Sequence, residues 1–314
     1  MKLILPVAGR GTRVHPHSFS KPKPFFKILN KPAICHIIDS LFCLDIEEII
    51  FIVDKFNGDA FKELMPKLYP KYKFQYVLQD VPEGPAHALW LTKDLIKEDD
   101  EVFINFCDTL FEHDMTFLKT LDSKYDGVIF VKGVEDYQRF GVVIEEDKVM
   151  KFIVEKPDTP VSKLANIGNY YFRDGFRFMQ GLQKMIDDDL KAKGEYYLPE
   201  AFMIMINDGQ KIFVQEIDKW LDTGKIETIL ETSAFLLNGG VLKGRNVKLD
   251  NCEIGKNVSI GDNTILRNCK INNSIIGENT LLEGLEIENS VIGDKVVLKK
   301  GGKVFNIGDK CSIE

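Results

Sequence analysis

Residues 3–13 read Leu-Ile-Leu-Pro-Val-Ala-Gly-Arg-Gly-Thr-Arg. The apolar run Leu3–Val7 is typical of a buried β-strand, and two glycines follow it at once. Backbone N–H groups in such a turn, at the end of a strand, can bind phosphate. The stretch is no dinucleotide fingerprint, because position 14 is Val, and no P-loop, because no Gly-Lys-Ser/Thr follows. A glycine-rich turn alone is more often only a tight turn, so the rest of the chain decides its meaning.

Short β-branched runs alternate with amphipathic stretches up to about residue 238. The predicted strands are Leu3–Val7, Glu48–Val53, Phe74–Gln79, Val102–Phe106 and Gly127–Val131. The predicted helical stretches are Pro32–Leu44, Gly58–Leu68, Pro85–Ile96 and Met115–Leu121. This alternation predicts a Rossmann-like α/β domain over residues 1–238, with a mostly parallel sheet and helices on both faces. Ligands bind such sheets beyond the C-terminal ends of the strands.

The pattern changes at Gly239, where an internal repeat begins. The stretch 271–280, Ile-Asn-Asn-Ser-Ile-Ile-Gly-Glu-Asn-Thr, recurs at 287–296 as Ile-Glu-Asn-Ser-Val-Ile-Gly-Asp-Lys-Val. Aliphatic residues at every fifth or sixth position mark a parallel β-solenoid. Gly, Asn and Asp would turn its corners, where positive φ is tolerated. The signal resembles the hexapeptide repeat, so we expect a short left-handed parallel β-helix of about four coils over residues 239–314.

Composition excludes several classes of protein. The 314 residues are 44% hydrophobic and 28% charged, as in ordinary globular proteins, and the net charge of −7 argues against a nucleic-acid partner. The first 38 residues nevertheless contain seven Lys or Arg and no acid, which suits a small polyanion such as a nucleoside triphosphate. A solvated basic surface is the alternative, although such surfaces normally interleave acids.

The six cysteines show no CxxC pair and no zinc-like spacing, which indicates reduced thiols. The first apolar run is short and has no cleavage site, so it predicts a strand rather than a signal peptide. No run has the length of a membrane span. We therefore expect a cytoplasmic protein without a membrane partner.

Several motifs, in order along the chain, resemble those of the sugar nucleotidyltransferase family, whose long members carry a C-terminal β-helix. They are Gly9-x-Gly-Thr-Arg13, Lys21-Pro-Lys23-Pro24, Asn30-Lys-Pro32, Gln79-Asp-Val-Pro-Glu-Gly84, Phe106-Cys-Asp108, Phe140-Gly141-Val142, Glu155-Lys156-Pro157, Ala165-Asn-Ile-Gly168-Asn-Tyr170 and Trp220-Leu-Asp222-Thr-Gly224. The stretch from Trp220 to Leu237 is most similar to the glucose-1-phosphate thymidylyltransferase-like long form. The resemblance implies that a nucleoside triphosphate and a sugar 1-phosphate form a nucleotide sugar and pyrophosphate.

The chemistry agrees with that expectation, because the attacking phosphate is largely ionised at neutral pH and needs no general base. The step requires in-line positioning and cancellation of negative charge. The resemblance implies that Asp108 and Asp222 bind Mg²⁺, which prefers carboxylate oxygens, and that Arg13 and Lys23 stabilise the leaving pyrophosphate. For Asp108 the alternative is a helix N-cap.

The remaining site predictions also rest on the resemblance. The expected nucleotide-binding residues are Ala8, Gly9, Gly11, Thr12, Gln79 and Gly84, with Gln79 able to bond a base edge. The expected sugar-phosphate-binding residues are Gly141, Glu155, Lys156, Asn166 and Gly168. Departures from the family pattern leave every catalytic group in place, and several of them line the base or sugar pockets. They are Arg10, Phe25, Phe26, Lys27, Pro85, Cys107 and Thr109.

Specificity therefore stays open. Glucose 1-phosphate with dTTP or UTP is the first choice, and a cytidylyltransferase acting on another phosphorylated metabolite is an alternative. A non-catalytic regulatory homologue would lack Arg13, Lys23, Asp108 or Asp222, and all four are present. An acyltransferase activity of the solenoid is disfavoured, because the last histidine is His113. The solenoid is instead expected to support a homo-oligomer or regulation.

Overall fold

The computed structural model describes residues 1–159 and 161–313. Its contacts divide the chain into two compact units. Unit 1 comprises Met1–Gly9 and Asp39–Trp220, and unit 2 comprises Arg10–Ile38 and the chain from Leu221 onward. The segment Arg10–Ile38, which we call the signature segment and which holds the motif residues from Gly11 to Pro32, thus belongs with the C-terminal part. The domain boundary at residues 238/239 stays a proposal.

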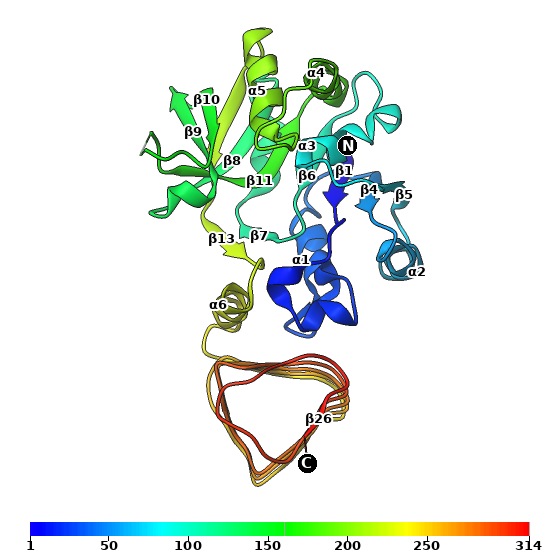
Figure 1. The fold of residues 1–314 in the computed structure, drawn as a ribbon, viewed down its shortest axis with the longest axis vertical. Helices are drawn as coiled ribbons and strands as arrows, with labels where there is room; N and C mark the ends of the chain where they lie inside the picture. The colour runs from blue at the N-terminus through cyan, green and yellow to red at the C-terminus, as the bar shows by residue number, and fades with distance from the viewer. Residues whose placement is uncertain (160, 314) are drawn as a thin grey trace. The chain divides into compact units, whose positions relative to one another are not determined.

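Unit 1 is built on one nine-stranded sheet in the order β5-β4-β1-β6-β11-β8-β12-β10-β9 (Figure 1). The strands are β1 (Lys2–Pro6), β4 (Glu48–Val53), β5 (Lys73–Leu78), β6 (Val102–Asn105), β8 (Gly127–Gly133), β9 (Gly141–Glu146), β10 (Val149–Glu155), β11 (Leu164–Phe172) and β12 (Ile212–Glu216). Parallel pairing aligns β5, β4, β1 and β6, and likewise β8 and β12, whereas β11 lies antiparallel between β6 and β8. The expected mostly parallel α/β sheet is confirmed, with antiparallel strands β11 and β10 inserted.

Helices cover both faces of this sheet. They are α2 (Gly58–Leu68), α3 (Pro85–Trp90), α4 (Gly175–Asp187) and α5 (Leu198–Asn207), with 3₁₀ turns at Lys93–Leu95, Met115–Thr120 and Tyr137–Arg139. Phe51 of β4 packs against Phe61 of α2, whereas its neighbours Ile50 and Ile52 point to the other face, into the core with α3, α4 and α5.

The predicted helical stretch Met115–Leu121 is a 3₁₀ segment, and Phe117 from it packs edge-on against Phe130 of the sheet. None of the helices in the described chain has the length and apolar character needed to cross a membrane.

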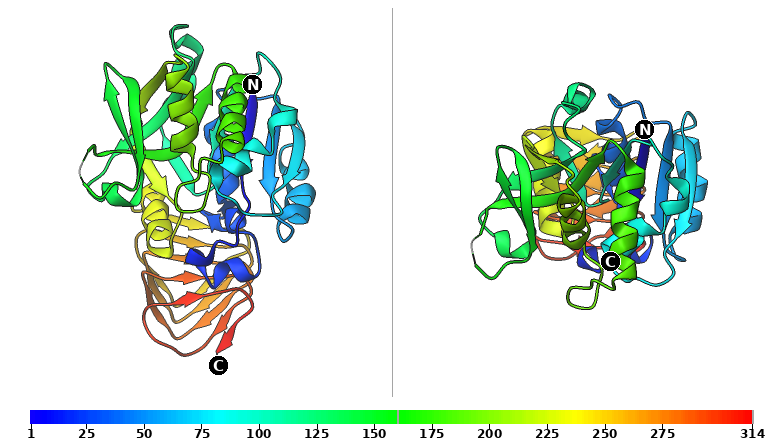
Figure 2. Two further views of the ribbon diagram at one scale, coloured as in Figure 1. Left: turned by 45° about the horizontal axis from the view of Figure 1, so that its top comes forward. Right: turned by 90° about the horizontal axis from the view of Figure 1, so that it is seen from above.

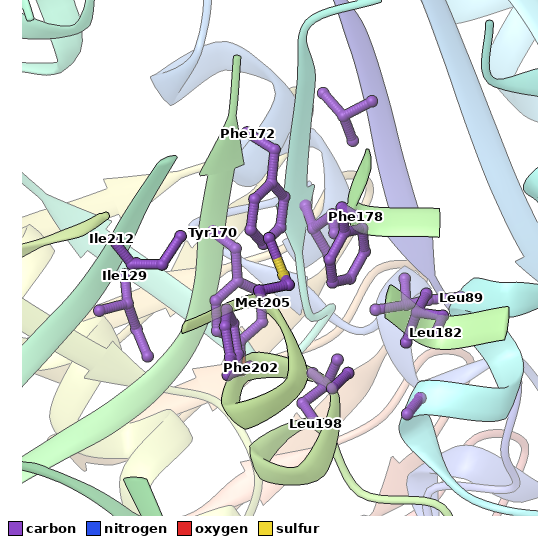
Figure 3. Close-up of a cluster of buried hydrophobic side chains, with 14 of the residues drawn as sticks. Leu89, Ile129, Tyr170, Phe172, Phe178, Leu182, Leu198, Phe202, Met205 and Ile212 are labelled. Atoms are coloured by element: carbon purple, nitrogen blue, oxygen red, sulfur yellow. The ribbon is translucent and has the colours of Figure 1, made fainter. Parts of the chain in front are cut away.

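One apolar core lies between the sheet and helices α3, α4 and α5 (Figure 3). Tyr170 and Phe172 from β11 point toward α4 and α5, where Phe172 stacks on Phe178 with centroids 4.1 Å apart. Phe202 of α5 packs against Tyr170 at 5.2 Å. These aromatic residues are all less than 2% exposed, and burying each contributes roughly 1.5–3 kcal/mol. The core thereby fixes β11, whose far end carries predicted sugar-site residues.

The unit 2 part of the signature consists of tight turns. They are 3₁₀ turns at Thr12–Val14, His17–Phe19 and Lys23–Phe25, followed by the hairpin of β2 (Lys27–Ile28) and β3 (Lys31–Pro32) and by α1 (Ala33–Ser40). Four prolines at positions 16, 22, 24 and 32 fix φ in this segment and limit its freedom. After β7 (Thr109–Glu112) in unit 1, the later elements that adjoin the signature motifs are β13 (Lys219–Asp222) and α6 (Ile226–Leu237).

The C-terminal repeat forms a parallel β-helix, drawn as a triangular coil in Figure 1. Its three sheets are β14-β17-β20-β23-β25, β15-β18-β21-β24-β26 and β16-β19-β22. Their strands are β14 (Val241–Lys243), β15 (Lys248–Asp250), β16 (Glu253–Ile254), β17 (Val258–Ile260), β18 (Ile265–Arg267), β19 (Lys270–Asn272), β20 (Ser274–Ile276), β21 (Leu281–Glu283), β22 (Glu286–Glu288), β23 (Val291–Ile292), β24 (Val297–Leu298), β25 (Asn306–Ile307) and β26 (Ser312–Ile313). The register pairs Ile275 with Val291, so the expected sixteen-residue spacing is one coil.

The corners are turned by asparagine rather than by the glycines of the repeat. Asn263 and Asn279, among others, have φ of 58° and 55°, and their amides stack along the edge at 3.4 Å. The Ile-Gly glycines are needed instead for close stacking of the coils. A Cβ on Gly277 would lie 2.3 Å from the carbonyl oxygen of Gly293. The expected role of positive-φ corner residues is confirmed for asparagine and for Gly284, at φ 70°, but it does not apply to the Ile-Gly glycines.

Gly277→Ala tests this packing. The added methyl would collide with backbone of the next coil, so we expect a loss of roughly 1–3 kcal/mol in the free energy of unfolding, seen as a lower thermal midpoint. Gly302→Ala is the matched control, because a Cβ there meets nothing within 4 Å. Equal midpoints for the two variants would contradict the stacking argument.

Candidate functional site

The turn after β1 is held by a clamp that the sequence did not predict. The N–H of Gly9 donates to Oδ2 of Asp54 at 2.8 Å, and Oδ1 of Asp54 accepts from the N–H groups of Phe56 and Asn57. Asn57 is buried and donates from Nδ2 to the carbonyl oxygen of Val7 at 2.7 Å. Only the position of Asp54, at the end of the neighbouring strand β4, could have suggested this clamp. Because the N–H of Gly9 is bonded to Asp54, it is not available to phosphate. Gly9 instead provides a backbone at φ 119° without a side chain, which a ligand could approach closely.

Gly11 brings the two halves of the signature together in unit 2. It has φ 57°, and a Cβ at this position would lie 2.7 Å from Cβ of Lys23. Its carbonyl oxygen accepts from the N–H of Val14 and from the hydroxyl of Ser18 at 2.8 Å. Any side chain here would push Lys23 away, so glycine is required for the approach of the 3₁₀ turn with Arg13 to Lys23.

Arg13 and Asp222, which are far apart in sequence, approach the same glycine in unit 2. The N–H of Gly224 donates to Oδ1 of Asp222 at 2.7 Å. A Cβ on Gly224 would lie 2.9 Å from that oxygen and 3.5 Å from Nη1 of Arg13. The main chain is further tied by the hydroxyl of Thr232, which donates to the carbonyl oxygen of Asp222 at 3.0 Å. The Trp-x-Asp-x-Gly motif thus holds a carboxylate close to a guanidinium.

Asp108 lies in a two-residue turn between β6 and β7, at the C-terminal end of a central parallel strand. The segment that follows is a strand, so the alternative role of helix N-cap is wrong. Within residues 1–159 and 161–313, no group of three or more His, Cys, Asp or Glu is arranged to hold a metal. A pair of aspartates is nevertheless a donor set that fits Mg²⁺, which usually takes one or two carboxylates and completes its shell with water and phosphate.

Gly84 begins α3 and is crowded by backbone. At φ 113°, a Cβ would lie 2.5 Å from the carbonyl oxygen of Tyr196. Hydrogen bonds from Tyr196 N to Glu83 O and from Ala86 N to Tyr196 O flank it. Gly84 is therefore required by the chain contact, whatever it binds. Gln79 ends the strand region of β5, half-buried, with its N–H donated to Val53 at 2.8 Å.

The hairpin of β9 and β10 brings three predicted sugar-site residues together in unit 1. Gly141 pairs with Glu155, and a Cβ on Gly141 would lie 3.0 Å from Oε2 of Glu155. The next residue, Lys156, has φ 45° and places its Nζ 3.4 Å from Oε1 of Glu155. The strained turn at Lys156 is held by its N–H bond to the carbonyl oxygen of Phe140 at 3.0 Å.

Asn166 and Gly168 form a second group, at an irregularity of β11. The pairing of β11 with β8 shifts between Asn166 and Tyr170. Oδ1 of Asn166 accepts from the N–H of Gly168 at 3.0 Å, and its Nδ2 donates to the hydroxyl of Tyr170 at 2.6 Å. Gly168 adopts φ 83° there.

Electrostatics join these two groups around an acid that the sequence did not single out. Burial raises the pKa of Glu200, and the charge of Glu155 raises it further. Burial likewise raises the pKa of Tyr170 and of Tyr197, with Glu155 again contributing. Oε2 of Glu200 is buried and has no hydrogen-bond partner in the described parts of the chain. Its location in the first turn of α5, beside Tyr197, was the one signal that could have marked it.

Comparison of the sequence with models of protein families identifies the family of this chain. Residues 2–239 match the model of the nucleotidyl transferases. The chain belongs to the nucleotidyl transferase family. It is a nucleotidyltransferase, and the sugar-1-phosphate nucleotidyltransferases among its relatives define the coarse class of its reaction.

Two curated relatives of this nucleotidyltransferase act on different sugars and bases, to judge from their names. It is 30% identical over 258 residues to the mannose-1-phosphate guanylyltransferase catalytic subunit beta of Dictyostelium discoideum, covering 79% of this chain and 67% of that one. It is 29% identical over 244 residues to the glucose-1-phosphate thymidylyltransferase of Mycolicibacterium smegmatis, covering 75% and 82%.

A solved structure shares the fold. A provisionally assigned glucose-1-phosphate thymidylyltransferase from Bacillus anthracis superposes with a TM-score of 0.65 and 25% identity, over 75% of this chain and 94% of that one. The α/β expectation is confirmed by this likeness.

Glu155→Gln tests the coupling around Glu200. Removing the neighbouring negative charge makes ionisation of Glu200 easier, so its raised pKa should fall toward the ordinary glutamate value of about 4.3. Carboxyl chemical shifts, followed by NMR as a function of pH, measure the change. Glu195→Gln is the control, because the charge of Glu195 raises the pKa of Tyr197 but does not affect the pKa of Glu200. An unchanged Glu200 pKa in Glu155→Gln would contradict the arrangement.

Proposed function

We propose that this nucleotidyltransferase joins a nucleoside monophosphate unit to a sugar 1-phosphate. A phosphate oxygen of the sugar attacks the α-phosphorus of the triphosphate, the bond from that phosphorus to the β-phosphate oxygen breaks, and pyrophosphate leaves with the electron pair. The attacking oxygen is already ionised, so no proton has to move. The work left to the protein is alignment and compensation of charge.

The observation that carries the proposal is the approach of Arg13 and Asp222 to Gly224 in unit 2. Nη1 of Arg13 is 3.5 Å from the position of a Gly224 Cβ, and Oδ1 of Asp222 is 2.9 Å from it. A fixed guanidinium matches phosphate oxygens and stays charged at any working pH. Lys23, packed against Gly11, is the proposed second cation for the leaving group.

We assign Asp108 and Asp222 as the Mg²⁺ ligands. When bound, the ion would neutralise phosphate charge that the two cations leave uncompensated. The Gly224 N–H bond orients one oxygen of Asp222, and the β6–β7 turn presents Asp108 at the sheet edge where ligands bind in this class of fold.

The remaining assignments divide between the two substrates. Ala8, Gly9, Gly11, Thr12, Gln79 and Gly84 are proposed for the nucleotide. Gly141, Glu155, Lys156, Asn166 and Gly168 are proposed for the sugar phosphate. In that second group Lys156 would contact the phosphate, and Glu155 would accept from a sugar hydroxyl. The unsatisfied Glu200 carboxyl supports adding it to this group, because a sugar hydroxyl would give the buried oxygen the partner it lacks.

For the substrates we propose glucose 1-phosphate with dTTP or UTP. The likeness to the relatives named for thymidylyl transfer supports this pair. Mannose 1-phosphate with GTP is the second candidate, because a relative at 30% identity is named for that reaction.

Pyrophosphate release tests the class and the specificity together. With Mg²⁺ present, dTTP, UTP, CTP, GTP and ATP are each combined with glucose 1-phosphate and mannose 1-phosphate. We expect turnover on glucose 1-phosphate with dTTP or UTP. Turnover only on mannose 1-phosphate with GTP would replace the substrate assignment. If no pair released pyrophosphate, although the protein bound a nucleotide, catalysis on these sugar phosphates would be contradicted.

Asp222→Asn tests the metal assignment on whichever pair is active. It keeps an oxygen for the Gly224 N–H but removes the charge, so we expect kcat to fall by about 100-fold or more with an unchanged thermal midpoint. Asp218→Asn is the matched control, since this nearby aspartate is exposed and pairs with His113 at 3.0 Å. Activity in Asp222→Asn at the level of Asp218→Asn would remove Asp222 from the site.

A further inference from the structure

The repeat places one carboxylate per coil along a single edge of the β-helix. Each follows an Ile-Gly pair, and we call these four residues the acidic edge: Asp262, Glu278, Asp294 and Asp309. Three of them cap the coil before their own. Oδ1 of Asp294 accepts from the N–H of Glu278 at 2.9 Å, and Oδ1 of Asp309 accepts from the N–H of Asp294 at 2.8 Å. Asp262 does the same for Arg245. Such carboxylates have a second oxygen with which to bind a cation.

The signature segment of the same unit lies on this edge. Nζ of Lys21 is 2.6 Å from Oδ2 of Asp294 and 3.1 Å from Oδ2 of Asp309, and the hydroxyl of Ser20 donates to the same oxygen of Asp309. One coil earlier, Lys27 pairs with Glu278. In Figure 2 (left) this segment, drawn in blue, lies beside the coils.

Uncharged residues at both ends of the signature segment also contact the β-helix. His17 is 1% exposed, and its Nε2 lies 2.8 Å from Oδ1 of Asn306 in β25, the last strand of its sheet. A Cβ on Gly308 would lie 3.1 Å from the carbonyl oxygen of Pro16, so that glycine admits the segment. At the other end, Nδ2 of Asn30 donates to the carbonyl oxygen of Ile260 at 2.8 Å. The segment therefore runs against the order of the coils, from the last toward the second.

The central ion pairs are sheltered rather than superficial. The side chains of Lys21, Asp294 and Asp309 are 20%, 17% and 8% exposed. Burial would lower the pKa of Lys21, but the hydrogen bond and charge of Asp294, with those of Asp309, raise it. Burial would raise the pKa of Asp309, but Ser20, the Asp294 N–H and Lys21 lower it. Both partners are thus charged throughout the neutral range.

The attachment lies next to the proposed polyphosphate cations. Lys21 is separated from Lys23 only by Pro22, whose ring fixes φ, and Pro24 follows. Lys23 in turn packs on Gly11, one residue from the 3₁₀ turn that holds Arg13. Because these prolines restrict the backbone, a shift of Lys21 off the acidic edge would also move Lys23.

We propose that the acidic edge of the β-helix is a positioning element for the nucleotide site, acting through Lys21 on Lys23 and Arg13. The β-helix thereby has a role within its own chain, besides any role in assembly. This inference rests on the proposed function of Arg13 and Lys23. Two lysines of the signature segment, Lys21 and Lys27, then bind the β-helix, while Lys23 and Arg13 are the cations proposed for the substrate.

Binding of magnesium pyrophosphate, measured by calorimetry, tests the proposal without knowledge of the base. We expect Lys21→Met to weaken binding about tenfold, within the range of typical coupling between sites, and Lys21→Arg to restore most of it. In the assay of the active substrate pair, KM for the triphosphate should rise while KM for the sugar phosphate stays constant. Lys303→Met is the matched control, because Lys303 pairs with Glu286 at 3.0 Å on another face of the same β-helix.

Substitution of the aspartates that pair with Lys21 gives an independent test. Asp294→Asn with Asp309→Asn keeps the oxygens that cap the coils but removes the charge that holds Lys21. We expect the same loss of pyrophosphate affinity, and no additional loss when Lys21→Met is combined with it, since both remove one interaction. Wild-type affinity in Lys21→Met or in the double Asn variant would overturn the proposal and leave the proposed function standing. Failure of the wild-type protein to bind pyrophosphate would remove both.

Discussion

The pairing of Lys21 with Asp294 and Asp309 is the interaction on which the signature segment depends. Exposed ion pairs contribute about 0–1 kcal/mol, whereas loss of one partner from a buried pair costs about 3–5 kcal/mol. With exposures of 20%, 17% and 8%, this group lies between those limits. A segment made of short 3₁₀ turns and prolines has little regular hydrogen bonding of its own, so anchoring of this size determines where it lies.

That interaction changes the meaning of the charge pattern. The acid-free stretch of 38 residues suggested a cationic surface for a polyanion. Lys2 instead pairs with Glu48 and Asp100 in unit 1, and Lys21 and Lys27 pair with the β-helix in unit 2. The acids that balance the stretch are thus supplied by distant sequence. Arg13 and Lys23 are the basic residues whose surroundings, Gly11 and Gly224, keep backbone close and side chains out of the way.

The sequence predicted the elements that have a local or repeating pattern, and it did not predict the contacts between distant segments. Strand β4 and helix α2 have the predicted bounds, because β-branched runs and amphipathic spacing are local signals. The internal repeat likewise predicted the sixteen-residue length of one coil. The Asp54 clamp on Gly9, the contact of Tyr196 with Gly84 and the unsatisfied carboxyl of Glu200 join distant segments, and composition carries no trace of them. Where a residue type was right for the wrong reason, as with Gly277, the register of neighbouring coils was the missing information.

Hydrogen exchange of single amides measures whether the acidic edge and the pyrophosphate site are coupled, because coupling between two sites is reciprocal. If the acidic edge positions the cations, magnesium pyrophosphate must in turn stabilise the edge. We expect bound magnesium pyrophosphate to slow exchange at the N–H groups of Glu278 and Asp294, which Asp294 and Asp309 cap, with little change at Lys270 on another sheet of the β-helix. Equal exchange at Glu278 and Asp294 with and without saturating pyrophosphate would contradict this coupling.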